Sequence, residues 1–219
     1  ERTFVTGSPM AEVLHANLDK IEASNVHQRL GLTKGQYILL SAHREENIDT
    51  DRNFVQLFTA VNAMAEKYDM PILYSCHPRS RKRLEATGFQ LDTRVIAHEP
   101  LGFHDYNCLQ MNAFAVVSDS GTLPEESSFF LSVGKPFPAV SIRTSTERPE
   151  ALDAGCFVLA GIDADSLLQA VEMAVGMQRA ECFGTPVAGY TAENVSMKVA
   201  RIIQSYTGIV NKMVWRKDG

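Results

Sequence analysis

The sequence lacks the features that would place it in several common classes of protein. No apolar stretch approaches the roughly 20 residues that a membrane-spanning helix needs, and the N-terminus has no signal-peptide pattern. The net charge is −5 and no basic stripe is present, which argues against a nucleic-acid partner. We therefore expect a cytoplasmic protein that binds neither membranes nor nucleic acids.

Cysteine and the familiar catalytic motifs are also scarce. The four cysteines stand singly, without the paired spacing of a zinc site or a disulfide framework: Cys76, Cys108, Cys156 and Cys182. Gly-x-Gly-x-x-Gly, a P-loop and a nucleophile elbow are absent, which argues against a dinucleotide dehydrogenase or an NTPase. The sequence predicts reduced thiols, no metal and no cofactor.

Short apolar runs alternate with helical patterns along the chain. The runs predict strands at 37–40, 71–75, 95–97, 113–117, 137–142 and 156–160, besides a short opening strand over 2–7. Helices are predicted at 10–23, 51–68, 104–112, 148–154, 165–177 and 193–206, with others starting near 123 and running through 81–83. Polar or weakly structured connections are expected at 25–35, 43–47 and 178–191. Such alternation predicts an α/β fold with a doubly wound, Rossmann-like parallel sheet of about six strands.

In this type of fold, loops at the carboxyl ends of the strands line the ligand crevice. That rule gathers His43-Arg44, His77-Pro78-Arg79 and 118–122 on one edge of the sheet. A histidine there donates hydrogen bonds to phosphate or moves a proton near neutral pH, although a solvated surface loop would also explain His43. His77 before a proline fits a turn better than a functional role. The basic run that follows fits a solvated helix face.

A buried strand leads into the turn 118–121 and then into a helix. The first amides of a helix lack intrahelical acceptors and carry the positive end of the macrodipole, which favours an anion. Gly121 allows a ligand oxygen to approach the backbone, and Ser120 and Thr122 add hydroxyls. One of two acids in the first helical turn would accept hydrogen bonds from a sugar diol, or would only complement the dipole. A nucleotide or phosphate site and an ordinary βα turn both remain open here.

Two further side chains are candidates for ligand contacts. Tyr106 would stack on a base, but an aromatic at helical spacing also fits a core position. Arg148 follows a strand end in a hydroxyl-rich loop, where a guanidinium fork suits a phosphate or a diol partner.

Three segments, taken in order, resemble the carboxyl-terminal domain of the non-hydrolysing UDP-N-acetylglucosamine 2-epimerases. They are Ser41-Ala42-His43-Arg44-Glu45-Glu46-Asn47, Ser118-Asp119-Ser120-Gly121-Thr122-Leu123-Pro124-Glu125-Glu126 and Thr146-Glu147-Arg148-Pro149-Glu150-Ala151. The opening Thr6-Gly7-Ser8-Pro9 is similar to that family's interdomain junction. The stretch from Val195 to Trp215 is similar to the branch that acts on UDP-N-acetyl-L-hexosamines, including UDP-N-acetyl-L-fucosamine formation, in capsule polysaccharide pathways.

The resemblance implies the carboxyl-terminal half of a two-domain GT-B enzyme. Residues 1–8 would form the interdomain junction, and residues 9–219 the nucleotide-binding α/β domain with its long terminal helix. Because the chain opens at Glu1 without a methionine, we expect it to be part of a longer polypeptide. The implied partners are a UDP-sugar substrate, the missing amino-terminal domain of the same polypeptide, and a second subunit in a homodimer.

The resemblance also implies roles for individual residues. They are Ser120, Gly121 and Thr122 at the diphosphate, Glu126 at the ribose hydroxyls, Arg148 at the nucleotide, Tyr106 near the uracil, and His43 at the diphosphate beside the reacting sugar. Arg44 and His77 would touch a second, regulatory UDP-sugar, although an alignment anchored on Pro78 puts Ser75 in place of His77. The chain departs from the family where Thr122 replaces a usual glycine and Glu45 replaces a usual arginine.

The implied reaction inverts C2 of a UDP-2-acetamido sugar by elimination and re-addition of UDP. The family's acid/base carboxylates belong to the amino-terminal domain, so this chain alone is expected to be inactive. Three alternatives stay open: the donor-binding domain of a GT-B glycosyltransferase, a hydrolysing epimerase relative, and a non-catalytic UDP-sugar-binding module.

Overall fold

The computed structural model describes residues 3–217, and within that range six parallel strands form one sheet in the order β3-β2-β1-β4-β5-β6. The strands are β1 (Ile38–Ser41), β2 (Ile72–Ser75), β3 (Val95–His98), β4 (Ala115–Ser118), β5 (Ala139–Ile142) and β6 (Val158–Ala160). Each is a short and mostly apolar run, as expected for parallel strands covered on both faces. The predicted α/β fold with a doubly wound parallel sheet is confirmed.

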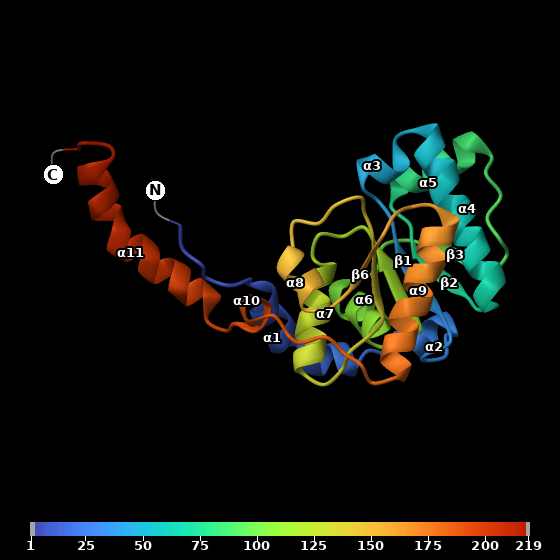
Figure 1. The fold of residues 1–219 in the computed structure, drawn as a ribbon, viewed down its shortest axis with the longest axis horizontal. Helices are drawn as coiled ribbons and strands as arrows, with labels where there is room; N and C mark the ends of the chain where they lie inside the picture. The colour runs from blue at the N-terminus through green and yellow to red at the C-terminus, as the bar shows by residue number, and fades with distance from the viewer. Residues whose placement is uncertain (1–2, 218–219) are drawn as a thin grey trace.

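Helices connect the strands and cover the sheet (Figure 1). They are α1 (Met10–Glu22), α2 (Val26–Leu30), α3 (Glu45–Ile48), α4 (Asp51–Tyr68), α5 (Pro78–Thr87), α6 (Phe103–Met111), α7 (Leu123–Ser132), α8 (Pro149–Asp153), α9 (Ala164–Arg179), α10 (Ala188–Thr191) and α11 (Val195–Met213). Side-chain oxygens cap the helices α4 and α9: Thr50 accepts from the Asn53 amide at 3.2 Å and Asp163 from the Ser166 amide at 2.9 Å.

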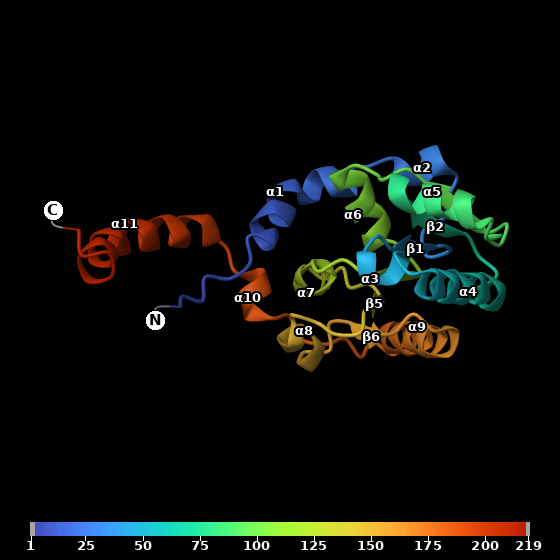
Figure 2. The ribbon, with the colours of Figure 1, turned by 90° about the horizontal axis from the view of Figure 1, so that it is seen from above.

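The sheet separates two hydrophobic clusters because successive side chains of a strand point to opposite faces. On one face Ile38 and Leu40 pack with the buried side of α4 and α9. On the other face Tyr37 and Leu39 pack with α1, α6 and α7. Figure 2 shows these two groups of helices on opposite sides of the strands. The core therefore holds the sheet from both faces, and the loops at the strand ends lie outside it.

The prediction of an opening strand is wrong for residues 3–7, the part of it that the structure describes. Residues 3–7 are extended but join no strand, and Arg2 lies outside the described residues. Val5 is 97% exposed, and Gly7 adopts a φ of +91° that turns the chain towards α10. The Ser8 amide donates to the Gly189 carbonyl at 2.7 Å. This segment therefore borders a helix and not the sheet.

Short helices occupy all three segments that were predicted to be irregular. The helix α2 lies within 25–35, and α10 lies within 178–191. The helix α3 begins within 43–47 and extends one residue beyond it. Four or five residues complete little more than one helical turn, so they cannot show the apolar periodicity by which a helix is predicted.

The terminal helix is longer than predicted and stands away from the rest of the chain. It continues through Gly208 to Met213, and it projects from the domain on the same side as the N-terminal segment (Figures 1 and 2). The rings of Phe4 and Tyr206 meet edge to face with their centroids 4.7 Å apart. Apolar side chains along α11, including Met197 and Ile203, are exposed. Over residues 3–217, no helix is long and apolar enough to cross a membrane.

Candidate functional site

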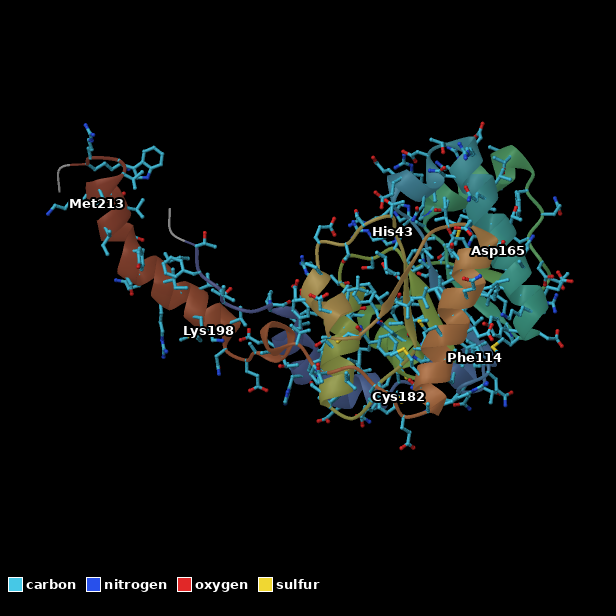
Figure 3. The ribbon with its side chains drawn as sticks, in the orientation of Figure 1. His43, Phe114, Asp165, Cys182, Lys198 and Met213 are labelled. Carbon is cyan, nitrogen blue, oxygen red and sulfur yellow. The ribbon has the colours of Figure 1, made fainter. Side chains whose placement is uncertain are left out.

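The strand register brings the loops after β1, β4 and β5 to one edge of the sheet. Ser41 pairs with Ser118, and Ser118 pairs with Ser141, so the three strands end almost level. Figure 3 shows His43 at this end of the domain and Cys182 at the other. The loops predicted to meet at the carboxyl edge therefore do meet. The loop after β2 is among them, because Ser41 also pairs with Ser75 and Arg79 contacts Glu45 at 3.1 Å.

Asp119 is the buried centre of this edge. It is fully buried, and its Oδ2 accepts from the backbone amides of His43 and Arg44 at 2.9 and 2.8 Å and from Asn47 Nδ2 at 3.2 Å. Asn47 Nδ2 also donates to the Ile142 carbonyl at 3.0 Å. One carboxylate thus ties the loop after β1 to the turn after β4, since hydrogen bonds to a charged acceptor are strong.

His43 lies beside that carboxylate. Its Nδ1 is 3.3 Å from Asp119 Oδ1 and 3.5 Å from Ser41 Oγ, while the half-exposed ring faces outwards. Asp119 Oδ1 has no hydrogen-bond partner among the described residues, so its contact with Nδ1 is a close approach and not a hydrogen bond. A ring whose Nδ1 faces a carboxylate turns its Nε2 away from it, towards a ligand. The geometry therefore suits a group that donates to an anion at the sheet edge.

The turn Ser120-Gly121-Thr122 stands directly before α7. Ser120 Oγ lies 2.9 Å from Thr122 Oγ1 and accepts from the Thr122 amide at 3.3 Å, and the Ser120 amide donates to Ser118 Oγ at 3.0 Å. These amides and hydroxyls bond to one another in a polar turn at the positive end of the α7 dipole, which is where a helix attracts an anion. This arrangement fits an oxyanion of phosphate type.

Two guanidinium groups flank the same turn. A Cβ built on Gly121 would lie 3.4 Å from Arg44 Nη2 and 4.0 Å from Arg143 Nη1. Arg44 was predicted to serve a separate regulatory site, yet the structure places it against the backbone of the predicted diphosphate turn. Arg143 was not identified from the sequence.

Glu126 projects from the first turn of α7 and is already hydrogen-bonded within the protein. Its Oε1 accepts from Thr122 Oγ1 at 2.7 Å and its Oε2 accepts from Gln110 Nε2 at 2.8 Å. Burial raises the pKa of this carboxyl, while the bonds from Gln110 and Thr122 counteract that effect. A carboxylate has about four acceptor positions, so two remain for a diol.

Tyr106, on α6, is partly in the core and partly at the site. Its ring packs against the cluster beneath α1, α6 and α7. Burial and then the Glu126 carboxylate raise the pKa of its hydroxyl, whereas the hydroxyls of Ser41 and Ser118 lower it. The phenol oxygen therefore points to the strand ends next to Glu126.

Arg148 contacts a neighbouring acid and, among residues 3–217, forms no hydrogen bond to the turn. Its Nε and Nη2 donate to the buried Glu125 Oε1 at 2.9 and 2.8 Å, and Ser8 Oγ donates to the other oxygen of the same carboxylate. These side chains line an open groove of about 750 Å³ between the segment 5–10, α7, α8 and α10. Arg148 is thus next to the groove where residues 3–8 leave the domain.

His77 is not drawn into this cluster. It is exposed, and its Nδ1 accepts from the Arg79 amide at 3.3 Å, which caps α5. Arg79 in turn pairs with Glu45 at 3.1 Å and with Asp49 at 2.6 Å. The contacts agree with the turn and solvated-helix interpretations of this segment.

Asp119, Gln110 and Arg143 were missed by the sequence analysis. A single signal was present for Asp119, because an acid directly after a parallel strand falls on the ligand edge. Arg143 carries the same signal, because it directly follows β5. Gln110 carries none, since its importance depends on a partner from another element.

A family model matches most of this chain and identifies its family. Residues 1–204 match the model described as UDP-N-acetylglucosamine 2-epimerase. This chain belongs to that family. The family prediction is confirmed, whereas the narrower L-fucosamine branch finds no support.

Individual members of the epimerase family agree with this assignment. An enzyme of Methanococcus maripaludis named UDP-N-acetylglucosamine 2-epimerase is 33% identical over 179 residues, covering 78% of this chain and 48% of that protein. The structure of the Rickettsia bellii UDP-N-acetylglucosamine 2-epimerase superposes with a TM-score of 0.84 at 36% identity, over 97% of this chain and 56% of that one.

A Methanocaldococcus jannaschii epimerase was solved in complex with UDP-GlcNAc and UDP. It has a TM-score of 0.79 at 26% identity, over 92% of this chain and 54% of the other. The present chain therefore spans about half the length of these epimerases. Its α/β fold with a parallel sheet corresponds to one half of a GT-B-type epimerase.

Proposed function

We propose that this chain is the nucleotide-binding, carboxyl-terminal domain of a UDP-2-acetamido-sugar 2-epimerase that interconverts UDP-N-acetylglucosamine and its C2 epimer. The observation that carries the proposal is the polar turn Ser120-Gly121-Thr122 between β4 and the positive end of the α7 dipole, in a member of the epimerase family. The bound UDP-GlcNAc and UDP of the Methanocaldococcus jannaschii relative support a UDP-sugar ligand.

The proposal gives each part of the edge a role. The α7 amides and the hydroxyls of Ser120 and Thr122 hold the diphosphate, and His43 donates to it beside the reacting sugar. Glu126 accepts from the ribose hydroxyls with its two remaining acceptor positions. Tyr106 lies towards the uracil. Arg148 reaches the nucleotide from its present place on Glu125.

The reaction requires a proton to leave C2 and UDP to leave C1. The electron pair of the C2–H bond forms the double bond of a glycal, and the C1–O bond breaks with its electrons going to the diphosphate. Re-addition of UDP reverses these steps after a proton reaches C2 from the opposite face. Because a C2 proton is weakly acidic, stabilising the diphosphate lowers the barrier. This chain supplies that stabilisation, and the other half of the enzyme supplies the acid/base carboxylates.

The remaining sequence predictions belong to this proposal and are untested. Residues 1–8 would join the two domains and 9–219 would form this one, and the whole enzyme would be a cytoplasmic homodimer. The L-hexosamine branch and the regulatory site of Arg44 and His77 also stay predictions. For the regulatory site, the position of Arg44 beside Gly121 favours a role close to the substrate diphosphate.

The proposal is tested by calorimetric titration of the chain with UDP. Saturable binding should weaken by about tenfold, or about 1.4 kcal/mol, in each of Ser120→Ala and Glu126→Ala. Ser205→Ala and Glu66→Ala, which change exposed residues on α11 and α4, serve as matched controls and should bind as the unaltered chain does. If circular dichroism shows that the unaltered chain is folded and it still does not bind UDP, the proposed nucleotide site is contradicted.

The alternatives are separated by products. When the chain is joined to its other half, an epimerase converts UDP-N-acetylglucosamine to its C2 epimer with UDP retained. A hydrolysing relative releases the free sugar, a glycosyltransferase requires an acceptor, and a binding module forms no product. A panel of UDP-D- and UDP-L-2-acetamido sugars in the same assay tests the L-hexosamine branch.

A further inference from the structure

Arg143 follows β5 directly and lies under the turn that starts α7. Its side chain is 5% exposed, and Nη1 is 4.0 Å from the position that a Cβ would take on Gly121. Arg44 Nη2 is 3.4 Å from the same position. Two guanidinium groups therefore flank the backbone that the proposed function assigns to the diphosphate.

The donors of Arg143 are only partly used. Nη1 and Nη2 donate to the two carboxylate oxygens of Glu147 at 2.6 and 2.7 Å. Nε is buried and has no hydrogen-bond partner among the described residues, and the Glu46 oxygen lies 3.7 Å away. A buried donor without an acceptor is costly, so this group is poised for an additional acceptor.

The acids around this arginine differ from it in exposure. The side chains of Glu147 and Glu46 are 60% and 48% exposed, so either one can turn into water, whereas Arg143 cannot leave its buried place. Glu147, Glu46 and the buried Asp119 together outnumber Arg143 and Arg44. A diphosphate, which carries further negative charge, therefore requires an exposed carboxylate to withdraw.

We propose that Arg143 is a ligand of the diphosphate and that Glu147 occupies its guanidinium fork until the diphosphate displaces it. A carboxylate and a phosphate offer an arginine fork the same pair of oxygen acceptors, so Glu147 stands where phosphate oxygens would bind. Glu147 thereby competes with the substrate and lowers its affinity. This inference rests on the proposed function, because it takes the ligand at the turn to be a nucleoside diphosphate.

If Glu147 competes with the diphosphate, changing Arg143 and changing Glu147 should alter the affinity for UDP in opposite directions. Calorimetric titration with UDP should show about tenfold weaker binding for Arg143→Met and about threefold tighter binding for Glu147→Gln. Neither variant should change the affinity for uridine, which lacks phosphate. Arg143→Lys keeps the charge without the fork and should also weaken UDP binding; it replaces Arg143→Met if circular dichroism shows that the methionine variant is unfolded.

The control is an ion pair away from the edge. Lys67 and Glu172 join α4 to α9 with Nζ and Oε2 2.7 Å apart, and Lys67→Met and Glu172→Gln should leave UDP binding unchanged.

The outcomes separate this inference from the function on which it rests. If Glu147→Gln weakens UDP binding as the Arg143 variants do, the pair only stiffens the loop and the inference is overturned. If both partners can be changed without effect on UDP affinity, Arg143 is no ligand while the nucleotide site stands. If the unaltered, folded chain binds no UDP, the proposed nucleotide site fails and this inference fails with it.

Discussion

At the scale of single residues, ligand binding at the carboxyl edge of the sheet is expected to depend on open space at Gly121 as much as on side chains. A methyl group on Gly121 would lie at ordinary van der Waals distances from Arg44 and Arg143, and the backbone of this glycine does not need a positive φ. An alanine can therefore fold here. It would, however, cover the backbone face that a ligand oxygen approaches.

Gly121→Ala is accordingly expected to separate binding from stability. Its melting temperature should stay within about 2 °C of that of the unaltered chain, since surface changes of this kind cost little. Its affinity for UDP should fall by about tenfold. Thermal unfolding and calorimetry check the two quantities, with Gly208→Ala on α11 as the control, because a Cβ at Gly208 meets nothing within 4 Å. Equal losses of stability and affinity would contradict the steric explanation.

We expect Glu126 to make the binding of a nucleoside dependent on pH. Its pKa is raised by burial, so the folded state holds the proton more tightly than the unfolded state does. Acidification through this raised pKa relieves the cost of burying the charge and favours the folded, unliganded chain. It also removes acceptor capacity, because a protonated carboxyl accepts fewer hydrogen bonds.

Uridine affinity should therefore decline as the pH falls, and the decline should begin above the ordinary range of a glutamate. Uridine is chosen because it carries no phosphate whose ionisation would interfere. Glu126→Gln should bind uridine weakly and without this dependence, whereas Glu66→Gln should behave as the unaltered chain. A competition titration across the acidic range measures the effect, and an unchanged decline in Glu126→Gln would assign it to another group.

The sequence identified part of this edge, and the physical reason lies in locality. Ser120, Gly121 and Glu126 follow a buried strand within a few positions, so strand, turn and helix start could be seen in one window. Arg143 and Gln110 gain their importance from contacts with other elements, namely the approach to Gly121 and the bond to Glu126. No local pattern encodes such contacts. The same limit applies to Asp119, whose partners lie on the loop after β1.

At the scale of elements, prediction succeeded where a segment was long or buried and failed where it was neither. The parallel strands and the helices α4 and α9 show continuous apolar runs or a clear stripe, and they appear close to the predicted positions. The helices α2, α3 and α10 are too short for a stripe. The opening segment looked like a strand by composition, but residues 3–7 have no strand beside them to supply hydrogen bonds.

The cap of α9 allows one contribution to element stability to be measured. Asp163 accepts from the Ser166 amide, so Asp163→Ala should lower the free energy of unfolding by about 1 kcal/mol. Asp163→Asn keeps an acceptor and should retain most of that energy. Urea denaturation gives both values, and equal destabilisation by the two variants would show that charge and not the hydrogen bond is responsible. UDP binding should not change, because Asp163 follows the outermost strand β6, whereas the candidate site lies at the ends of β1, β4 and β5.

At the scale of the whole molecule, the proposal divides the chemistry between two domains. In that proposal this chain would hold the leaving diphosphate, and the proton transfers would depend on carboxylates of the other half. Because the chain spans about half the length of the epimerases it matches, we expect it to bind UDP without turnover.

That expectation is checked by nuclear magnetic resonance of UDP-N-acetylglucosamine incubated with the 219-residue chain in deuterated water. No deuterium should enter C2 and no C2 epimer should form, whereas the protein with both halves should give both signals. Multiple turnovers by the 219-residue chain, repeated after a second purification, would contradict the division of labour.

The projecting helix α11 has a consequence for how the chain scatters X-rays. A compact chain of this length has a radius of gyration of about 17 Å, and the 19 residues of α11 add an arm about 28 Å long on one side. Small-angle scattering should therefore give a larger radius and a distance distribution with a long shallow tail. If another domain covers α11, the tail should be shorter than expected for the mass of the particle. The scattering curve therefore distinguishes an α11 that stands in solvent from one that lies against a neighbour.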